Sequence, residues 1–161
     1  MKGRHLQLLL YILVFLLLIP FSLSAAEPAS GLSSGQLLYV PAYSDIYVGN
    51  SERPFQLTVT LSIRNIDPIK EITVRSVKYY ETKGVFIKSY IEKPVVLQPM
   101  ETLRYVIPEK DTRGGSGANF MVRWHAASPV NPPIVESVMI GSRSQQGISF
   151  TSRGKELIPH D

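Results

Sequence analysis

The chain has 161 residues and contains no cysteine. This length suits one domain and is too short for two ordinary ones, and the lack of thiols excludes disulfides and cysteine nucleophiles. The formal net charge is +4, but Lys2 and Arg4 precede Glu27, the first acidic residue, so the remainder carries only about +2. Such a balance argues against a dedicated nucleic-acid-binding surface, which usually carries a clustered basic stripe.

The N-terminal segment has the three parts of a secretory signal peptide. A positively charged start is followed by the apolar run Leu6–Ile19, which ends at Pro20, and then by small residues from Ser22 to Ala26. This order predicts a signal peptide over residues 1–26, cleaved after Ala26, and therefore a periplasmic or extracellular protein. An uncleaved membrane anchor is the alternative, although the run is shorter than the roughly 20 apolar residues that a spanning helix needs.

Residues 27–35 are rich in Ser, Ala, Gly and Pro, and we expect a flexible spacer there. From Gln36 onward, short apolar runs are separated by turn residues. The clearest run, Phe55–Arg64, predicts one strand with a buried face and a wet face, because its apolar and polar side chains alternate strictly. Its apolar members are Phe55, Leu57, Val59, Leu61 and Ile63.

A second long strand and a hairpin are predicted next. The run Ile72–Tyr80 alternates, but its phase shifts partway, which predicts a β-bulge near Arg75 or Ser76. Glu81–Gly84 has the composition of a tight turn, in which the glycine supplies a positive φ. The strand is therefore expected to form a hairpin with Val85–Ile91.

The remaining apolar runs give the fold class. Further strands are predicted at Val95–Leu97, Thr102–Ile107, Phe120–His125 and Ile134–Ile140, with shorter candidates at Leu37–Val40, Ile46–Val48 and Ile148–Thr151. Seven to nine short strands without a convincing helix predict an antiparallel immunoglobulin-like β-sandwich over residues 36–152, followed by a polar tail over residues 153–161. A small β-barrel is the alternative.

Two segments resemble a known protein family. They are YYETKGVFIKSYIEKPVVLQPMET, which spans Tyr79–Thr102, and GGSGANFMVRW, which spans Gly114–Trp124. Both are similar to segments of an exported bacterial family catalogued as the domain of unknown function DUF3124, and Gly115–Phe120 is the most specific part. The resemblance covers roughly Leu38–Gly141; it implies an exported bacterial protein without an assigned activity, and it supplies no site residues. The Leu97–Thr102 segment also looks like turns in bacterial immunoglobulin-like modules, which concerns the fold alone.

The sequence contains only an incomplete version of a motif for nucleophilic catalysis. Gly114–Ala118 resembles the Gly-x-Ser-x-Gly nucleophile elbow, but alanine replaces the last glycine and a predicted strand follows instead of a helix. A set of Ser116, His125 and Asp111 can be written down, yet nothing in the spacing requires it. We therefore expect that the protein has no catalytic residues and is not an enzyme.

Metal ligands would have to come from histidine and methionine. The candidates are His125, His160, Met100, Met121 and Met139. No His-x-His, His-x-Met or Met-x-Met pair exists among them, and Met121 and Met139 fall in predicted strands, where methionine more often fills a core. We therefore expect no metal and no cofactor.

Recognition is the function that remains. A glycine-rich connection precedes Phe120, and functional loops are common on rigid sandwiches. Arg123 and His125 share one face of the next strand while Trp124, which we expect in the core, takes the other. The candidate binding residues are Gly114, Gly115, Ser116, Gly117, Asn119, Arg123 and His125.

The sequence thus predicts an exported, non-enzymatic β-sandwich that binds a protein partner or a cell-envelope component. No nucleic-acid partner is expected, and a membrane is contacted only through an uncleaved leader. One alternative is a small-ligand carrier, a metal carrier or a hydrolase that uses the Gly114–Asn119 loop with His125. Another is a structural subunit that adds strands to a neighbour's sheet edge.

Overall fold

The structure, a computed structural model, describes residues 31–49, 53–143 and 146–158. The predicted leader, residues 1–26, and the first four residues of the predicted spacer lie outside this part. Apart from one turn of 3-10 helix, η1 (Thr112–Gly114), the regular elements of the described chain are all strands. They are β1 (Ser33–Pro41), β2 (Asp45–Tyr47), β3 (Pro54–Gln56), β4 (Thr58–Arg64), β5 (Ile72–Tyr80), β6 (Phe86–Ser89), β7 (Val95–Leu97), β8 (Thr102–Ile107), β9 (Asn119–Val130), β10 (Ile134–Arg143), β11 (Gln146–Arg153) and β12 (Lys155–Glu156).

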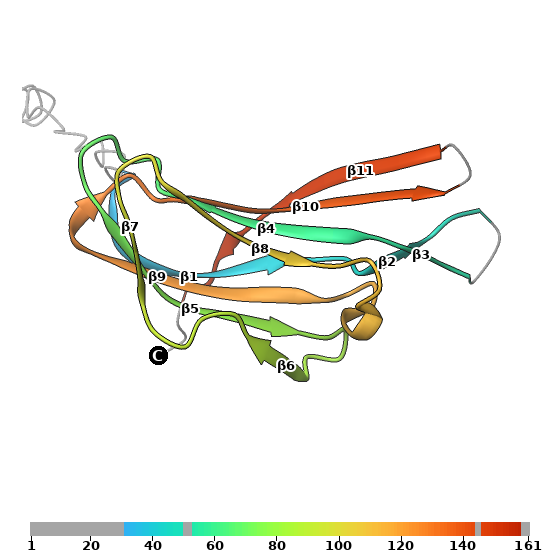
Figure 1. Cartoon of the computed structure of the whole chain (residues 1–161). Coiled ribbons are helices and arrows are strands. Elements are labelled where there is room, and N and C mark those ends of the chain that lie inside the picture. Colours follow the sequence, from blue (N-terminus) through green and yellow to red (C-terminus); the bar gives the residue numbers. More distant parts are fainter. Residues whose placement is uncertain (1–30, 50–52, 144–145, 159–161) are drawn as a thin grey trace, which may run out of the picture. The chain divides into compact units, whose positions relative to one another are not determined.

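Two antiparallel sheets pack against each other (Figure 1). The six-stranded sheet has the order β12–β1–β9–β5–β6, with β7 also paired to β5, and the four-stranded sheet has the order β11–β10–β4–β8. Strands β2 and β3 form a small sheet of their own. The all-β, sandwich-like prediction is confirmed. The barrel alternative is wrong, because over the described residues each main sheet ends at edge strands instead of closing on itself.

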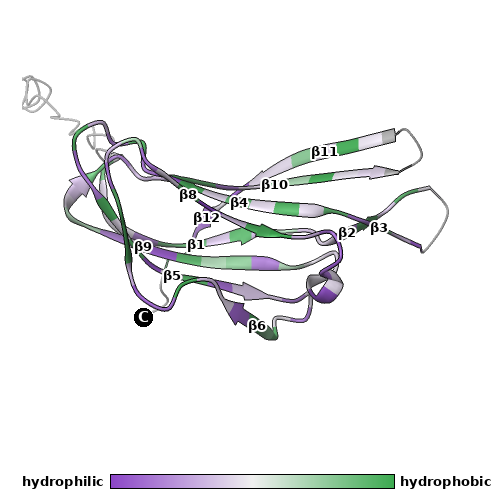
Figure 2. Cartoon of the chain, in the orientation of Figure 1, coloured by the Kyte–Doolittle hydropathy of each residue, from purple (hydrophilic) through white to green (hydrophobic). Residues whose placement is uncertain are grey.

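The core lies between the sheets and follows the predicted alternation. Leu57, Val59, Leu61 and Ile63 are each 0% exposed, and they belong to the same buried cluster as Trp124 of β9. Figure 2 shows the alternation as bands of apolar and polar colour along β4 and β11. Each such side chain contributes about 1.5–3 kcal/mol by leaving water, and this burial holds the two layers together without disulfides.

The predicted strand Phe55–Arg64 is divided. The structure has twelve strands over the described residues, not seven to nine, and one cause is a break at Leu57 between β3 and β4. The Leu57 N–H donates to the carbonyl of Ser44 at 2.9 Å, so that β3 pairs with β2 while β4 enters the four-stranded sheet. Alternation records which side of the chain is buried and says nothing of a change of partner strand.

The strands also extend beyond their predicted limits. Ser33, in the predicted spacer of residues 27–35, already begins β1. Strand β9 runs on to Val130, through residues predicted as loop. The residues Lys155–Glu156, in the predicted polar tail, form β12 along β1. Backbone groups pair across these segments whether or not their side chains are apolar, so hydropathy alone does not mark their ends.

The hairpin prediction is confirmed in detail. Strand β5 has the predicted bounds, and its register with β9 shifts between Val74 and Ser76, where the bulge is expected. The Glu81 N–H donates to the carbonyl of Val85 at 3.0 Å, and Gly84 has a φ of 81°. The bulge turns Arg75 out of the alternation, which matters for the site described below.

A polar cluster that we call the Asn65 corner joins three connections at one end of the sandwich, on the left in Figure 1. Asn65 is 1% exposed. Its Nδ2 lies 2.9, 3.2 and 3.0 Å from the carbonyl oxygens of Lys70, Leu97 and Gln98, and its Oδ1 accepts the N–H of Asp67 at 3.0 Å. The corner therefore ties the β4–β5 connection to the turn between β7 and β8.

Asp67 extends the Asn65 corner to the β9–β10 connection. Its Oδ2 accepts the backbone N–H of Asn131 at 3.0 Å, and its Oδ1 accepts the N–H groups of Ile69 and Lys70. The backbone N–H of Asn131, followed by those of Ile69 and Lys70, lowers the pKa of Asp67 from its ordinary 3.8 to about 2. Such bonds favour the charged carboxylate, and burial opposes them only partly.

Acid should weaken the fold through Asp67. Because its pKa is lower in the folded chain, the ionised carboxylate stabilises the domain above about pH 4, and this stabilisation is lost as the pH falls through about 2. We expect Asp67→Asn to be less stable than wild type at neutral pH, with a difference that shrinks below about pH 4 in urea denaturation curves. Glu92→Gln changes an exposed carboxylate that has no bond to a described residue and is the control. Identical pH profiles of wild type and Asp67→Asn would contradict this account.

Candidate binding site

Packing explains two glycines of the predicted loop, which lies at the end of the sandwich opposite the Asn65 corner (Figure 1). Gly114 is buried, and a Cβ there would lie 1.8 Å from the hydroxyl of Tyr79 and 2.7 Å from Oγ of Ser44. Gly115 has a φ of +70°, which residues with a side chain rarely adopt. The fold therefore requires both glycines whether or not a ligand binds.

The polar backbone groups of the loop are bonded within the fold. The Gly114 carbonyl accepts two hydrogen bonds from Thr82, one from its N–H at 3.0 Å and one from its side-chain hydroxyl at 2.9 Å. The Gly115 carbonyl accepts the N–H of Ser44 at 3.0 Å. The Gly117 N–H donates to Oγ1 of Thr82 at 3.0 Å. The loop is thus fastened to the β5–β6 turn and to the segment after β1.

The loop does not reach the other predicted site residues. Ser116 is half-buried within it, and Asn119, which is 9% exposed, begins β9. From Asn119 to His125 an extended strand rises about 20 Å. The Asp111 carboxylate instead pairs with Arg113 at 2.7 Å. The described structure therefore separates His125 from Ser116, so the three residues do not assemble a triad.

Arg123 and His125 lie where the strand alternation predicts. Trp124 is 1% exposed and belongs to the core, as expected, and Arg123 and His125 take the opposite, outer face of the six-stranded sheet. The indole N–H of Trp124 donates to Oε1 of Gln36 at 3.2 Å, and Nε2 of Gln36 donates to Oε2 of Glu156 at 2.8 Å. This chain of bonds links the core tryptophan to the neighbouring strand β1 and, beyond it, to the edge strand β12.

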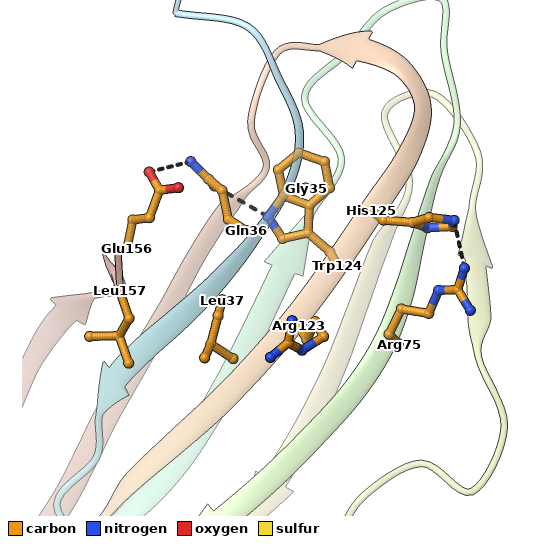
Figure 3. A pocket seen from close by; sticks show the side chains of 9 residues that line it. All are labelled: Gly35, Gln36, Leu37, Arg75, Arg123, Trp124, His125, Glu156 and Leu157. Atoms are coloured by element: carbon orange, nitrogen blue, oxygen red, sulfur yellow. Dashed lines mark hydrogen bonds between the residues drawn. The ribbon is translucent and has the colours of Figure 1, made fainter. Parts of the chain in front are cut away.

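A pocket of about 530 Å³ opens beside this chain of bonds (Figure 3). Its charged lining includes Arg75 from the β5 bulge and Arg123 from β9, and we call it the Arg75–Arg123 pocket. Its apolar lining includes Leu37 of β1 and Leu157, which follows β12. The pocket therefore draws on four neighbouring strands, and two predicted site residues, Arg123 and His125, meet in it.

The approach of β1 to β9 beside the pocket depends on Gly35. A Cβ at Gly35 would lie 2.9 Å from the carbonyl oxygen of Trp124 and 3.4 Å from Cα of His125. The register of β1 against β9 also shifts between Ser33 and Gly35. The glycine thus lets the first residues of β1 lie close against the strand that carries Arg123 and His125.

The contact between Arg75 and His125 determines which tautomer a neutral imidazole adopts. Nη2 of Arg75 lies 2.8 Å from Nε2 of His125 (Figure 3). A guanidinium can only donate, so Nε2 must be the acceptor and a neutral ring carries its proton on Nδ1. That Nδ1 is buried and has no hydrogen-bond partner among the described residues. The ring thus holds the Arg75 guanidinium in place without neutralising its charge.

Sequence reasoning missed several members of the pocket. The sequence indicates Arg75 only as a possible bulge residue. That bulge is the signal that could identify Arg75 as a site residue, since bulges often redirect a side chain. Gln36, Glu156 and Leu157 carried no local signal, because they join the pocket only through the pairing of β1 with β9 and β12.

Two packed antiparallel sheets and a pocket on the outer face of one of them define an all-β domain of the sandwich type. The sequence profile of the family described as "Protein of unknown function (DUF3124)" matches residues 35–157, so the chain belongs to this family, as the resemblance of its two segments predicts. The match runs from Gly35 in β1 to Leu157 just after β12, and so includes the whole described lining of the pocket.

Other comparisons add little. A search of curated proteins gives no match. The solved crystal structure of Thermotoga maritima 1070 is similar with a TM-score of 0.42 and 11% identity, over 74% of this chain and 92% of that one. Within the described residues, none of the helical structure has the length and apolar character needed to span a bilayer, and no three His, Asp or Glu side chains gather as metal ligands.

Proposed function

We propose that this chain is an exported, non-enzymatic β-sandwich domain that binds a protein partner or an envelope component through the outer face of its six-stranded sheet. The observation that carries the proposal is the Arg75–Arg123 pocket. Neither of its guanidiniums forms an ion pair with a described residue. Arginine is favoured at recognition surfaces, because one planar group offers several donors and a stacking surface.

Two finer expectations belong to this proposal. Export is supported by the three-part leader of residues 1–26, and sequencing of the mature N-terminus should then give Glu27 first. An immunoglobulin-like arrangement is supported by the pairs β4–β8 and β5–β9. In the immunoglobulin fold, strand B pairs with strand E and strand C pairs with strand F. In chain order β4 and β8 correspond to B and E, and β5 and β9 correspond to C and F.

The alternatives are supported unequally. A small-ligand carrier is favoured by the pocket volume of about 530 Å³, which falls in the range of roughly 300–1,000 Å³ for ligand sites. A hydrolase built on Ser116 and His125 has no comparable support, because the first half of β9, from Asn119 to His125, separates them.

Site-specific photocrosslinking in intact cells tests the proposal. A benzophenone side chain at Tyr39, which is 36% exposed on β1 beside the pocket, should give adducts with a partner. The same side chain at Val106, which is 44% exposed on β8 of the other sheet, is the matched control and should give none. Failure of Tyr39 to crosslink, or the same adducts from both positions, would contradict the proposal.

A further inference from the structure

We infer that the Arg75–Arg123 pocket binds the carboxylate or phosphate group of an organic anion. The inference rests on the proposed binding function and names the chemical class of the ligand. Three features support it: the unused donors of the pocket, the absence of acidic side chains from the outer positions of the described strands around it, and its apolar wall.

The unused bonding capacity of the pocket consists of donors. Arg123 is exposed and forms no hydrogen bond or ion pair with a described residue. Arg75 uses one donor on His125 and keeps the others of its guanidinium. Carboxylates and phosphates accept two such bonds at once from one arginine, and these charge-assisted bonds are roughly twice as strong as neutral ones.

Glu156, the one acid among the described lining residues, forms no ion pair with the two arginines. Glu156 pairs in register with Leu38, whose side chain is in the core, so Glu156 is directed away from the outer face. Its Oε2 accepts Nε2 of Gln36, and it makes no ion pair with Arg75 or Arg123. The positive charges of the pocket therefore remain available to a ligand.

Among the described residues, the four strands around the pocket direct no acidic side chain to the outer face. The register aligns Lys155, Tyr39, Met121 and Lys78 in one row across β12, β1, β9 and β5. With Arg123 in the next row, the outward positions of these four strands carry lysine and arginine but no aspartate or glutamate. A face with one sign of charge raises the local concentration of ligands of the opposite sign.

The apolar wall favours an organic anion over a bare one. Leu37 and Leu157 are half-buried and line the pocket together with Arg123 (Figure 3). A hydrocarbon segment next to the charged group would cover these side chains and gain hydrophobic free energy. The source of the anion is either a lipid-like molecule or a small soluble acid, and the probes below separate the two.

Titration calorimetry tests the inference on protein isolated from cells that express the full chain. The probes are dodecyl phosphate, dodecanoate, inorganic phosphate and the uncharged dodecyl maltoside. We expect both dodecyl anions to bind, and Arg75→Ala and Arg123→Ala each to weaken binding about tenfold or more. Binding should also weaken as salt rises, since the face is exposed. Arg104→Ala, which removes an exposed arginine from β8 on the other sheet, is the matched control and should bind like wild type.

The calorimetry results separate the possible ligands of the pocket. Inorganic phosphate binding as tightly as dodecyl phosphate would overturn the organic part of the inference, because the apolar wall would then add nothing. Weaker binding of inorganic phosphate, with the affinity for the dodecyl anions unchanged by Leu157→Ala, would assign the site to small soluble acids. Weaker binding of inorganic phosphate, with Leu157→Ala reducing only the affinity for the dodecyl anions, would support the inference and assign the site to lipid-like molecules. Dodecyl maltoside binding as well as dodecyl phosphate, or anion binding that survives both arginine substitutions, would overturn the inference. If Tyr39 crosslinks a partner while no anionic probe binds, this inference fails and the proposed function stands.

Discussion

Asn65→Asp should destabilise the domain by about 3 kcal/mol or more, a large part of the roughly 5–15 kcal/mol that such a domain has. The substitution keeps the oxygen that accepts the Asp67 N–H and replaces the buried NH₂ group, which lies near three carbonyl oxygens, with an acceptor. Buried carbonyls would lose their donor and face a negative charge. Urea denaturation at neutral pH measures the loss.

The pH dependence of this variant separates the lost donor from a general packing defect. Protonation of the introduced carboxyl group restores a donor, so the stability gap to wild type should narrow as the pH falls. Gln98→Glu makes the same amide-to-carboxylate change at an exposed position of the same turn and should cost less than about 1 kcal/mol. A gap that is constant with pH, or equal losses at the two positions, would show that the corner is not held by the Asn65 donor.

The fold could be predicted where neighbouring residues encode it. In Phe55–Arg64 the alternation predicts the buried side chains at Leu57, Val59, Leu61 and Ile63 correctly, because a strand has a fixed period of two. It is wrong at the two other positions, since Phe55 is only half-buried and Ser62 is buried. The bulge in Ile72–Tyr80 was read from a shift in that same period. The division at Leu57 is not predictable from the local pattern, because it depends on a hydrogen bond to Ser44, a residue in the connection between β1 and β2.

The candidate site likewise contains residues that the local pattern predicts and residues that only strand pairing brings in. That Arg123 and His125 share a face follows from local alternation, and so does the burial of Trp124. That Arg75 joins them depends on the pairing of β5 with β9 and on the exact place of the register shift. Pairing between distant segments is set by the whole sandwich, so a single sequence does not reveal which charges meet across it.

The glycine-rich loop shows how one local signal fits two explanations. Glycine marks a position where a side chain does not fit, and the excluding neighbour can be a ligand or the protein itself. At Gly114 the neighbours are Tyr79, Ser44 and Ala118 of the same chain. The glycines that made the loop a predicted binding site are therefore explained by packing. The pocket lies further along β9, at Arg123 and His125.

Gly114→Ala is expected to cost about 3 kcal/mol, since overpacking a filled core displaces its neighbours. The added methyl group would lie 1.8 Å from the Tyr79 hydroxyl, and Tyr79 is 0% exposed and bonded to Ser44 at 2.9 Å. Thermal and urea denaturation measure the effect. Gly147→Ala, where nothing lies within 4 Å of the new Cβ, is the matched control and should change stability by less than about 0.5 kcal/mol.

A second substitution identifies the clash as the cause. Tyr79→Phe removes the nearest atom, so in the Tyr79→Phe background Gly114→Ala should cost measurably less than alone, a non-additivity expected only of groups in contact. Folded Gly114→Ala protein should still bind dodecyl phosphate like wild type, because Arg123, the first pocket residue of β9, lies about 13 Å along the strand from the end of the loop at Asn119. Loss of that binding with Arg123 intact would place the loop in the site and remove the reason for treating its glycines as structural.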